Sequence, residues 1–331
     1  MLLPFQKKLV DRVKAGVEEV LAGGNSYGIL LLGESGAGKT YGLDQISILY
    51  PPGMDGDQPI TFLVRISAET AANYRSFLES LLLQLGWSEA RLKMLKSGRD
   101  CARELYKVLR TRKVVILILE EVHNSLTTES KQFRSQVEEF LKNLWNFYPA
   151  EAGAMWAHHR PGAVDRKLVI ICSGTLKLKP VFEQNSELRS RYPWVIDADK
   201  LTLVEVADLV RFRQIIDAMA RRFELADVID PDDDHFCLAC YLAADAHLRD
   251  LETLFQDARR LRKQSADAGP CPDRATAAAL VCGWFGIAYD DFAVDLAKSF
   301  NPFRASIDEV KKAAGRLREK QKLAALAKRR R

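Results

Sequence analysis

An octapeptide close to the start of the chain has the composition and spacing that a phosphate-binding loop requires. It begins at Gly33, ends at Thr40 and reads Gly-Glu-Ser-Gly-Ala-Gly-Lys-Thr. Glycines allow the backbone to wrap so that its N–H groups converge on a β-phosphate, and the start of the following helix adds the positive end of a dipole. Lys39 would bridge the β- and γ-phosphates, and the Thr40 hydroxyl would ligate Mg²⁺. We predict a nucleotide site made by Gly33, Glu34, Ser35, Gly36, Ala37, Gly38, Lys39 and Thr40.

Two consecutive carboxylates, Glu120 and Glu121, follow the most hydrophobic run of the chain, residues 114–119. A carboxylate at the tip of a neighbouring strand can hold Mg²⁺ and its waters, and the next acid can polarise the attacking water. We assign Glu120 to the metal and Glu121 to the water. Asp is more usual on the metal side, and the extra methylene of Glu120 bears on the hydrolysis rate more than on binding. The alternative is a pair of solvated acids at a strand end.

Further residues are candidates for contacts with a γ-phosphate. Ser173 and Thr175 end the next buried strand, where they could sense the γ-phosphate or orient the lytic water, although an ordinary strand-to-helix turn has the same residue types. Arg191 lies shortly before Pro193, and in a ring of subunits such an arginine reaches the γ-phosphate of the neighbour and stabilises transition-state charge. Pairing with solvent or a carboxylate is its alternative. Arg249 opens a later helix, where it could contact the same nucleotide.

Short apolar runs and helical patterns position these residues. Buried strands are expected at residues 28–32, 60–66, 114–119 and 168–173. Helices are expected at 5–21, from the glycine loop to about 50, and at 71–85, 99–112 and 130–147. Strands that are buried on both faces and alternate with helices imply a parallel sheet between helical layers. After about residue 201 only helical patterns remain, at 204–223, 234–244, 248–263 and 274–284. We therefore predict an α/β domain at 1–200, a helical lid at 201–300 and a basic tail at 301–331.

Composition limits the class of protein. The chain has 331 residues, 47% of them hydrophobic and 28% charged, which suits a folded protein with a sizeable core. No apolar run approaches the ~20 residues that a membrane-spanning helix needs. The first residues lack the order of a secretory signal, and six cysteines in so long a chain are not a disulfide framework. We expect a cytoplasmic protein with no membrane contact.

Two local features have competing interpretations. Cys237 and Cys240, with His235 nearby, resemble half of a zinc site, but no second Cys-x-x-Cys pair follows, and we predict that they pack in the core of a helix. Residues 304–331 contain eleven Lys or Arg against three Asp or Glu, a net charge of +8, so the remaining residues carry −3 of the formal +5. Such a tail suggests a polyanionic or acidic partner, and a helix end that only aids solubility is the alternative.

Taken together, these motifs resemble the AAA+ ATPases, and within them the TniB/TnsC family of transposition regulators. The resemblance covers roughly residues 5–303. It is carried by the acid strand with Glu-Val-His-Asn after it, the strand that ends Ser-Gly-Thr at 173–175, the segment 186–192 that contains Arg191, and Asn-Pro-Phe at 301–303. Departures from the family pattern are Glu120 for Asp, Tyr192 for Phe, and Ala246 where a glycine often precedes the second arginine.

The resemblance implies a P-loop NTPase of the AAA+ type with ATP and Mg²⁺ as cofactors. It implies an ATP-dependent adaptor that assembles with itself as a ring or helical filament on double-stranded DNA. Such proteins connect a TniQ-type target selector to a DDE transposase, sometimes with a CRISPR effector choosing the site, and hydrolysis then disassembles the filament. Arg191 would act in trans, so that ATP turnover requires assembly and is stimulated by DNA.

Contact with DNA would be made to phosphates and would be sensitive to salt. Arg110, Arg112 and Lys113, just before the acid strand, are candidates for a ring lumen, with local ion pairing as the alternative. The tail is expected to bind DNA or the transposase. Two other functions compete with transposition. One is a helicase loader or replication initiator, which a winged-helix domain after the cap would favour, although little sequence follows Trp284. The other is a nucleotide-switched scaffold with little hydrolysis, which Glu120 keeps open.

Overall fold

The computed structural model describes residues 3–55, 58–68, 71–146, 167–198, 202–203, 206–245, 247–265, 274–293 and 300–329. They form two compact units. One, the α/β unit, comprises Leu2–Ser35 and Lys39–Asp199, and the other, the helical unit, comprises Met1, Gly36–Gly38 and Lys200–Arg331. None of the helices in these described ranges combines the length and the apolar character needed to cross a membrane.

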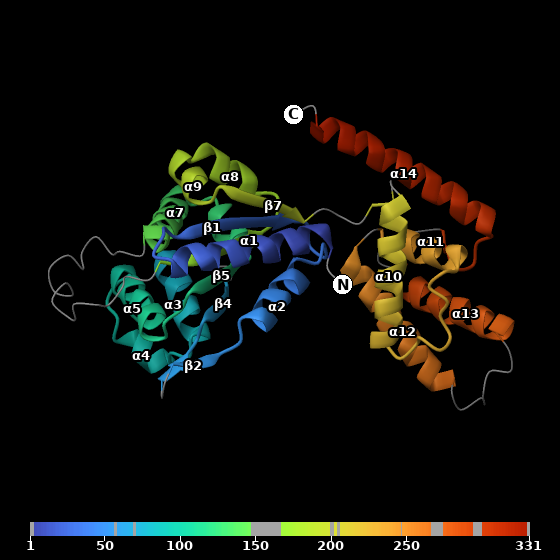
Figure 1. The fold of residues 1–331 in the computed structure, drawn as a ribbon, viewed down its shortest axis with the longest axis horizontal. Helices are drawn as coiled ribbons and strands as arrows, with labels where there is room; N and C mark the ends of the chain where they lie inside the picture. The colour runs from blue at the N-terminus through green and yellow to red at the C-terminus, as the bar shows by residue number, and fades with distance from the viewer. Residues whose placement is uncertain are drawn as a thin grey trace. The chain divides into compact units, whose positions relative to one another are not determined.

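The α/β unit is built on a five-stranded sheet in the order β4-β5-β6-β1-β7, and every neighbouring pair of strands is parallel (Figure 1). The strands are β1 (Tyr27–Gly33), β4 (Leu63–Ser67), β5 (Ile116–Glu120), β6 (Val169–Gly174) and β7 (Trp194–Ala198). The prediction of a parallel α/β fold is therefore confirmed. Because parallel strands end at the same edge of a sheet, the phosphate loop after β1, Glu120 and Gly174 are brought to one edge.

Helices cover the sheet because successive side chains of each strand point to opposite faces. Leu30 and Leu32 of β1 join a core that includes Phe77 and Phe140 of the helices, whereas α1 and α2 pack along β1. The helices of this unit are α1 (Pro4–Leu21), α2 (Lys39–Leu49), α3 (Tyr74–Gln84), α4 (Glu89–Lys93), α5 (Gly98–Thr111), α6 (His123–Leu126), α7 (Lys131–Asn146), α8 (Leu178–Gln184) and α9 (Ser186–Arg191).

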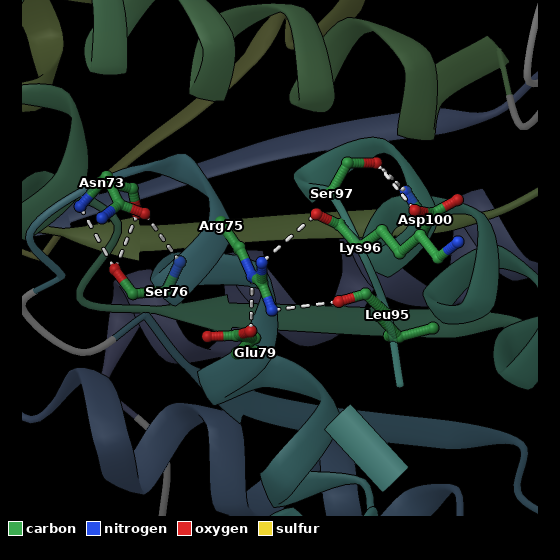
Figure 2. Close-up of polar contacts among 8 residues, drawn as sticks. All are labelled: Asn73, Arg75, Ser76, Glu79, Leu95, Lys96, Ser97 and Asp100. Atoms are coloured by element: carbon green, nitrogen blue, oxygen red, sulfur yellow. Dashed lines mark hydrogen bonds and ion pairs between the residues drawn. The ribbon is translucent and has the colours of Figure 1, made fainter. Parts of the chain in front are cut away.

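Side-chain caps fix the starts of α3 and α5 (Figure 2). Asn73 and Ser76 form a reciprocal capping box at the start of α3, which supplies partners for amide groups that have none inside a helix. Arg75 donates from Nη2 to the Leu95 carbonyl at 3.0 Å, so α3 is tied to the segment that leads into α5. Ser97 caps α5 by accepting from the backbone of Asp100.

Two parts of the sheet differ from the sequence expectation. The single strand expected at 60–66 is divided, since Ile60 ends the short β3 (Gln58–Ile60), which pairs with β2 (Gly53–Asp55), and β4 begins only at Leu63. The edge strand β7 was not predicted. Its burial alternates between exposed and buried positions, so it lacks the continuous apolar run that marks β1, β5 and β6.

The helical unit contains α10 (Val206–Arg222), α11 (Asp234–Ala243), α12 (Leu248–Ser265), α13 (Arg274–Ala293) and α14 (Ile307–Arg329). Val204 and Glu205, where a helix was expected to start, lie outside the described residues, and α13 continues nine residues beyond the predicted end at 284. Phe285 of α13 is its aromatic centre, with rings of Phe236, Phe255 and Phe303 at 5.0, 4.9 and 5.4 Å. Phe303, from the Asn-Pro-Phe segment, is therefore a core residue.

The two cysteines of the Cys-x-x-Cys segment are buried in α11, where core packing was predicted. The Cys237 thiol donates to the Pro231 carbonyl at 3.1 Å. Burial raises the pKa of Cys237 to about 12 and that of Cys240 well above its usual value, so both are thiols at neutral pH. A protonated, buried thiol behaves as a small apolar side chain.

Candidate functional site

The phosphate loop connects β1 directly to α2, as predicted. Gly36 and Gly38 have φ angles of 78° and 87°, a region in which a residue with a Cβ is strained. Lys39, the first residue of α2, is buried, and its ammonium donates to the carbonyls of Gly33 and Glu34 at 2.8 and 2.9 Å. Thr40 follows on the exposed side of the first turn. The lysine is thus held within the curve of the loop, with its charge directed at backbone dipoles.

Glu120, the first of the two acids, is held by an arginine from the adjacent strand. The β4–β5 register places Ser67 opposite Glu120, and Arg65 lies two residues earlier on β4, on the same face of the sheet. Its guanidinium binds both carboxylate oxygens of Glu120, through Nε and through Nη2 at 3.0 Å. Its Nη1 donates to Oδ1 of Asp44 on α2 at 2.5 Å. This Arg65–Glu120–Asp44 cluster was not foreseen from the sequence.

The pKa of Arg65 reports the strength of this pairing. Burial acts to lower it, and the hydrogen bonds and charges of Glu120 and Asp44 more than offset that effect, so the pKa is raised. The side chains of Arg65 and Glu120 are 22% and 19% exposed, so solvent screens the pair only in part. A bidentate, charge-assisted pair of this kind is stronger than an ordinary hydrogen bond.

Glu121, the second acid, has different surroundings. Its backbone is in the left-handed region, with φ at 55°, which costs a non-glycine residue on the order of 1 kcal/mol. Its side chain is 45% exposed, and Oε2 lies 3.2 Å from Nδ1 of His123. The strained turn directs Glu121 away from Glu120 and toward the first residue of α6.

His123 connects three parts of the site. A Cβ on Gly174 would lie 3.2 Å from its Nδ1, so the imidazole packs on the end of β6. Burial lowers the pKa of His123, the ammonium groups of Lys39 and Lys177 lower it further, and Glu121 acts in the opposite direction. The ring is therefore neutral at pH 7 and lies within electrostatic reach of the phosphate-loop lysine. From the sequence, His123 was identified only as part of the Glu-Val-His-Asn segment that carries the family resemblance, and no role was predicted for it.

The end of β6 abuts the turn after β5. Val122 donates from its amide to the Ser173 carbonyl at 3.1 Å, and the Ser173 side chain is buried. The Thr175 hydroxyl is buried and has no hydrogen-bond partner within the described part of the chain. Such a group is costly unless something satisfies it. The structure thus brings Lys39, Glu121, Ser173 and Thr175 to one edge of the sheet.

Arg191 does not join this edge. A Cβ on Gly28 would lie 2.1 Å from the Arg191 carbonyl oxygen, so the arginine backbone sits against the start of β1. Gly28 and Gly33 are five residue steps apart along the strand, about 16 Å at the usual rise. The Arg191 side chain is 21% exposed, with Nη1 3.7 Å from Oε2 of Glu187, and Glu187 also accepts an ion pair from Lys142 at 2.8 Å.

The remaining predicted residues have other surroundings. Arg249, the exposed second residue of α12, lies beside Gly36 of the phosphate loop, which belongs to the same unit: a Cβ on Gly36 would lie 3.3 Å from the Cβ of Arg249. The amide of Leu248 donates to the Gly36 carbonyl at 3.2 Å. Arg112 donates to the Leu85 carbonyl at 2.7 Å, which is a hydrogen bond to the backbone and not the ion pair considered as the alternative for this group. Arg110 lies in the last turn of α5, and Lys113 is in the left-handed region with φ at 54°. Ala246, the departure before Arg249, lies outside the described residues.

Comparison with solved structures confirms the fold. The Aeropyrum pernix ORC2 protein in its ADPNP-ADP complexes is similar over 97% of this chain and 95% of its own, with a TM-score of 0.58 and 12% identity. The ADP form of the same protein covers 94% of this chain and 83% of its own, with a TM-score of 0.53 and 13% identity. At such low identity the likeness shows the fold alone, a parallel sheet covered by helices with a helical region after it.

Comparison of sequences gives a narrower result. No curated protein gives a significant match to the chain. A protein-family model, described as TniB, the bacterial TniB protein, matches residues 6–150, which contain most of α1, the phosphate loop and the two acids at the end of β5. The match agrees with the resemblance inferred from the sequence motifs, and it covers less than half of the chain.

Proposed function

We propose that this protein is an ATP-dependent regulator of DNA transposition that assembles with itself on duplex DNA. In this proposal it binds ATP at the phosphate loop, links a TniQ-type target selector to a DDE transposase, and leaves the DNA when ATP is hydrolysed. The observation that carries the nucleotide part is the meeting of Lys39, His123 and Glu121 at one edge of the sheet. The TniB match over residues 6–150 supports the transposition part.

The residues at the loop fit a magnesium nucleotide. Thr40 offers a hydroxyl and Glu120 a carboxylate, both hard oxygen donors of the kind that Mg²⁺ prefers. When bound, the ion would neutralise charge on the β- and γ-phosphates. Glu120 is paired with Arg65 in this structure, so it must exchange a guanidinium for the ion or its waters.

In the proposed reaction the chain positions and polarises rather than forming covalent bonds. Lys39 exchanges its two loop carbonyls for oxygens of the phosphates. Glu121 accepts a proton from the attacking water at its exposed carboxylate, with His123 beside it. The buried hydroxyl of Thr175, and Ser173 next to it on β6, would contact the γ-phosphate or the water. These roles are supported by placement at the edge of the sheet where the loop and β5 end.

We assign Arg191 to the nucleotide of a neighbouring protomer. Its position at the start of β1, roughly 16 Å of strand away from the loop of its own chain, supports action in trans. Glu187 and Lys142 hold the α9 segment in the single protomer. Arg249 would contact the nucleotide from the helical unit. DNA would be held by its phosphates, in a salt-dependent and largely sequence-independent manner.

Mixing two inactive variants tests this proposal. Lys39→Ala protomers should bind no nucleotide, and Arg191→Ala protomers should bind it without turning it over. A mixture should regain ATP turnover, because each Lys39→Ala protomer lends its arginine to an intact neighbouring site. Arg191→Ala mixed with the Lys39→Ala/Arg191→Ala double variant is the control and should stay inactive. Full turnover by Arg191→Ala alone would overturn the assignment.

A second candidate function is a nucleotide-switched scaffold that hydrolyses ATP very slowly. The Arg65–Glu120 pair favours it, because a guanidinium on the metal-side acid opposes the approach of a divalent cation. ATP turnover measured with and without duplex DNA separates the two. Acceleration by DNA supports the transposition regulator, whereas ATP-dependent assembly without acceleration and without DNA binding supports the scaffold.

A further inference from the structure

The basic end of the chain is a fixed helix. Most of it forms α14, which packs on α11 and buries Val310 and Ala314. Ser306 caps the helix through a reciprocal pair of contacts with Glu309, whose carboxylate accepts from the Ser306 amide at 2.9 Å. Gln321 contacts the Tyr241 hydroxyl of α11. Because both halves of the helix are attached, its exposed side chains are held in a defined order.

Three exposed cations form one row along α14. Lys312, Arg316 and Lys320 follow one another at intervals of four residues, so they lie on one ridge of the helix, about 6 Å apart along its axis. Within the described ranges none of them forms an ion pair, whereas the neighbouring Lys322 pairs with Glu319 at 3.1 Å. We call these three residues the basic ridge.

A second basic helix of the same unit shows that this is not a general property of its surface. On α12 every cation of one segment has a carboxylate partner: Arg259 and Lys263 pair with Glu224, Arg260 with Asp257, and Arg262 with Asp227. Four cations thus share three carboxylates, so most of the positive charge of this segment is offset within the unit. The three cations of the basic ridge have no such partner within the described residues, so their charge is available to a molecule outside this unit.

We propose that the basic ridge binds the phosphate backbone of duplex DNA. The inference rests on the proposed function, because it names the surface through which a DNA-binding regulator would hold its duplex. Duplex DNA carries one negative charge per about 1.7 Å of its axis, and each phosphate neutralised by a side chain releases condensed counterions. Cations on an anchored helix lose little freedom on binding, which favours this surface over the long side chains of a flexible tail.

A different occupant would use a different part of the helix. Leu323 and Leu326, on the last turns, are 67% and 54% exposed. An acidic protein partner would bury this apolar pair together with the charges. The ridge lies before the pair along the helix and contains cations only, which fits phosphates better than a mixed protein surface. The basic ridge and the apolar pair can therefore be tested separately.

The experiment measures binding of a fluorescent 40-base-pair duplex to the full chain across salt concentrations, with a non-hydrolysable ATP analogue present. Loss of three phosphate contacts in Lys312→Gln/Arg316→Gln/Lys320→Gln should reduce the slope of log K against log salt by about 2.7 and weaken binding on the order of 10²-fold at 0.1 M salt. Lys7→Gln/Lys8→Gln/Lys14→Gln, on the exposed side of α1, changes the net charge equally and should keep the slope.

Each outcome decides the matter. An unchanged slope in the ridge variant overturns the ridge proposal while leaving DNA binding intact, and a wild-type chain that binds no duplex overturns the DNA part of the proposed function. If the α1 control loses as much slope and affinity for duplex as the ridge variant, only net charge matters, and this also overturns the ridge proposal. If only Leu323→Ala/Leu326→Ala weakens duplex binding, the ridge proposal fails and α14 is assigned to a protein partner. If the ridge binds anionic vesicles and not the duplex, α14 is assigned to a membrane partner. Unchanged ATP turnover without DNA shows that the variants are folded.

Discussion

The two acids at the end of β5, Glu120 and Glu121, differ in the group that contacts their carboxylate. On the β4 side, Glu120 is bound by the guanidinium of Arg65, which also binds Asp44. On the β6 side, Glu121 is half exposed on a strained turn and lies beside the neutral ring of His123. Two adjacent residues of the same type thus have a fully charged partner on one side and a polar, uncharged one on the other.

This difference separates a fixed acid from an adjustable one. A bidentate ion pair, shielded in part from water, sets the position of Glu120 and stabilises its ionised form. A single contact to a neutral imidazole leaves Glu121 able to rotate toward a water molecule. Environment rather than residue type assigns the roles of paired carboxylates in many active sites. We therefore expect substitutions on the two sides to affect different measurements.

The largest effect should come from Glu121→Gln. Loss of the group that takes the proton from water should lower ATP turnover by about 10²- to 10⁴-fold, while binding of a fluorescent ATP analogue remains. Phosphate release and analogue titration measure the two quantities. Lys39→Ala serves as the control that loses binding as well. Turnover within a few-fold of wild type would show that Glu121 is not the base.

Arg65→Gln should change the free energy of unfolding and the Mg²⁺ requirement rather than the transfer of a proton from the attacking water. It leaves Glu120 without its charged partner, and a double-mutant cycle with Glu120→Gln in urea should give a coupling free energy of about 2 kcal/mol. The same variant should need less Mg²⁺ to tighten binding of the ATP analogue, because the competing guanidinium is gone. A coupling near zero would mean that the pair does not hold Glu120 in solution.

His123→Asn should have an intermediate effect on turnover and little effect on binding. Residues that orient a reacting group through one contact commonly contribute about 10- to 100-fold. We expect a loss of about tenfold, with no further loss in the His123→Asn/Glu121→Gln double variant, since His123 acts through Glu121. Additive losses in the double variant would assign His123 an independent role.

The smallest effect should be a pH dependence of stability. The pKa of His123 in the folded protein lies below its value in the unfolded chain, so the unfolded state binds more protons as the pH falls through 6.5. Its contribution to stability is present above pH 6.5 and is lost at lower pH. Between pH 7.5 and 5.5 the melting temperature of the wild type should fall more than that of His123→Asn. An equal fall in both would exclude His123 as the source.

Local motifs were predictable because their chemistry lies in consecutive residues. The phosphate loop, the buried strands β1, β5 and β6, and the acids after β5 are each written in a short stretch, and the parallel sheet predicted from their alternation is confirmed. β7 was missed because an edge strand with alternating burial resembles a loop in composition. Its presence is decided by pairing with β1, which no local pattern records.

Arg65 shows a second limit of the sequence. It lies in a segment predicted as a strand, yet its partner is 55 residues away. The contact depends on the adjacency of β4 and β5 and on the one register that sets Ser67 opposite Glu120, and a shift of one residue would turn Arg65 to the other face. The ion pairs of α12 and α14 show the same limit, because the sequence gives the number of charged residues but not which cation has a carboxylate partner.

By itself the sequence determined the phosphate loop, the alternation of the buried strands β1, β5 and β6 with helices, and the place of two acids at a strand end, because each depends on residue type and short spacing. Only the tertiary structure decided which acid is held by a guanidinium, which histidine lies beside the phosphate-loop lysine, that Arg191 is remote from its own loop, and which cations on α14 remain unpaired within the described residues. These are contacts between segments far apart in the chain, and packing and register alone select them.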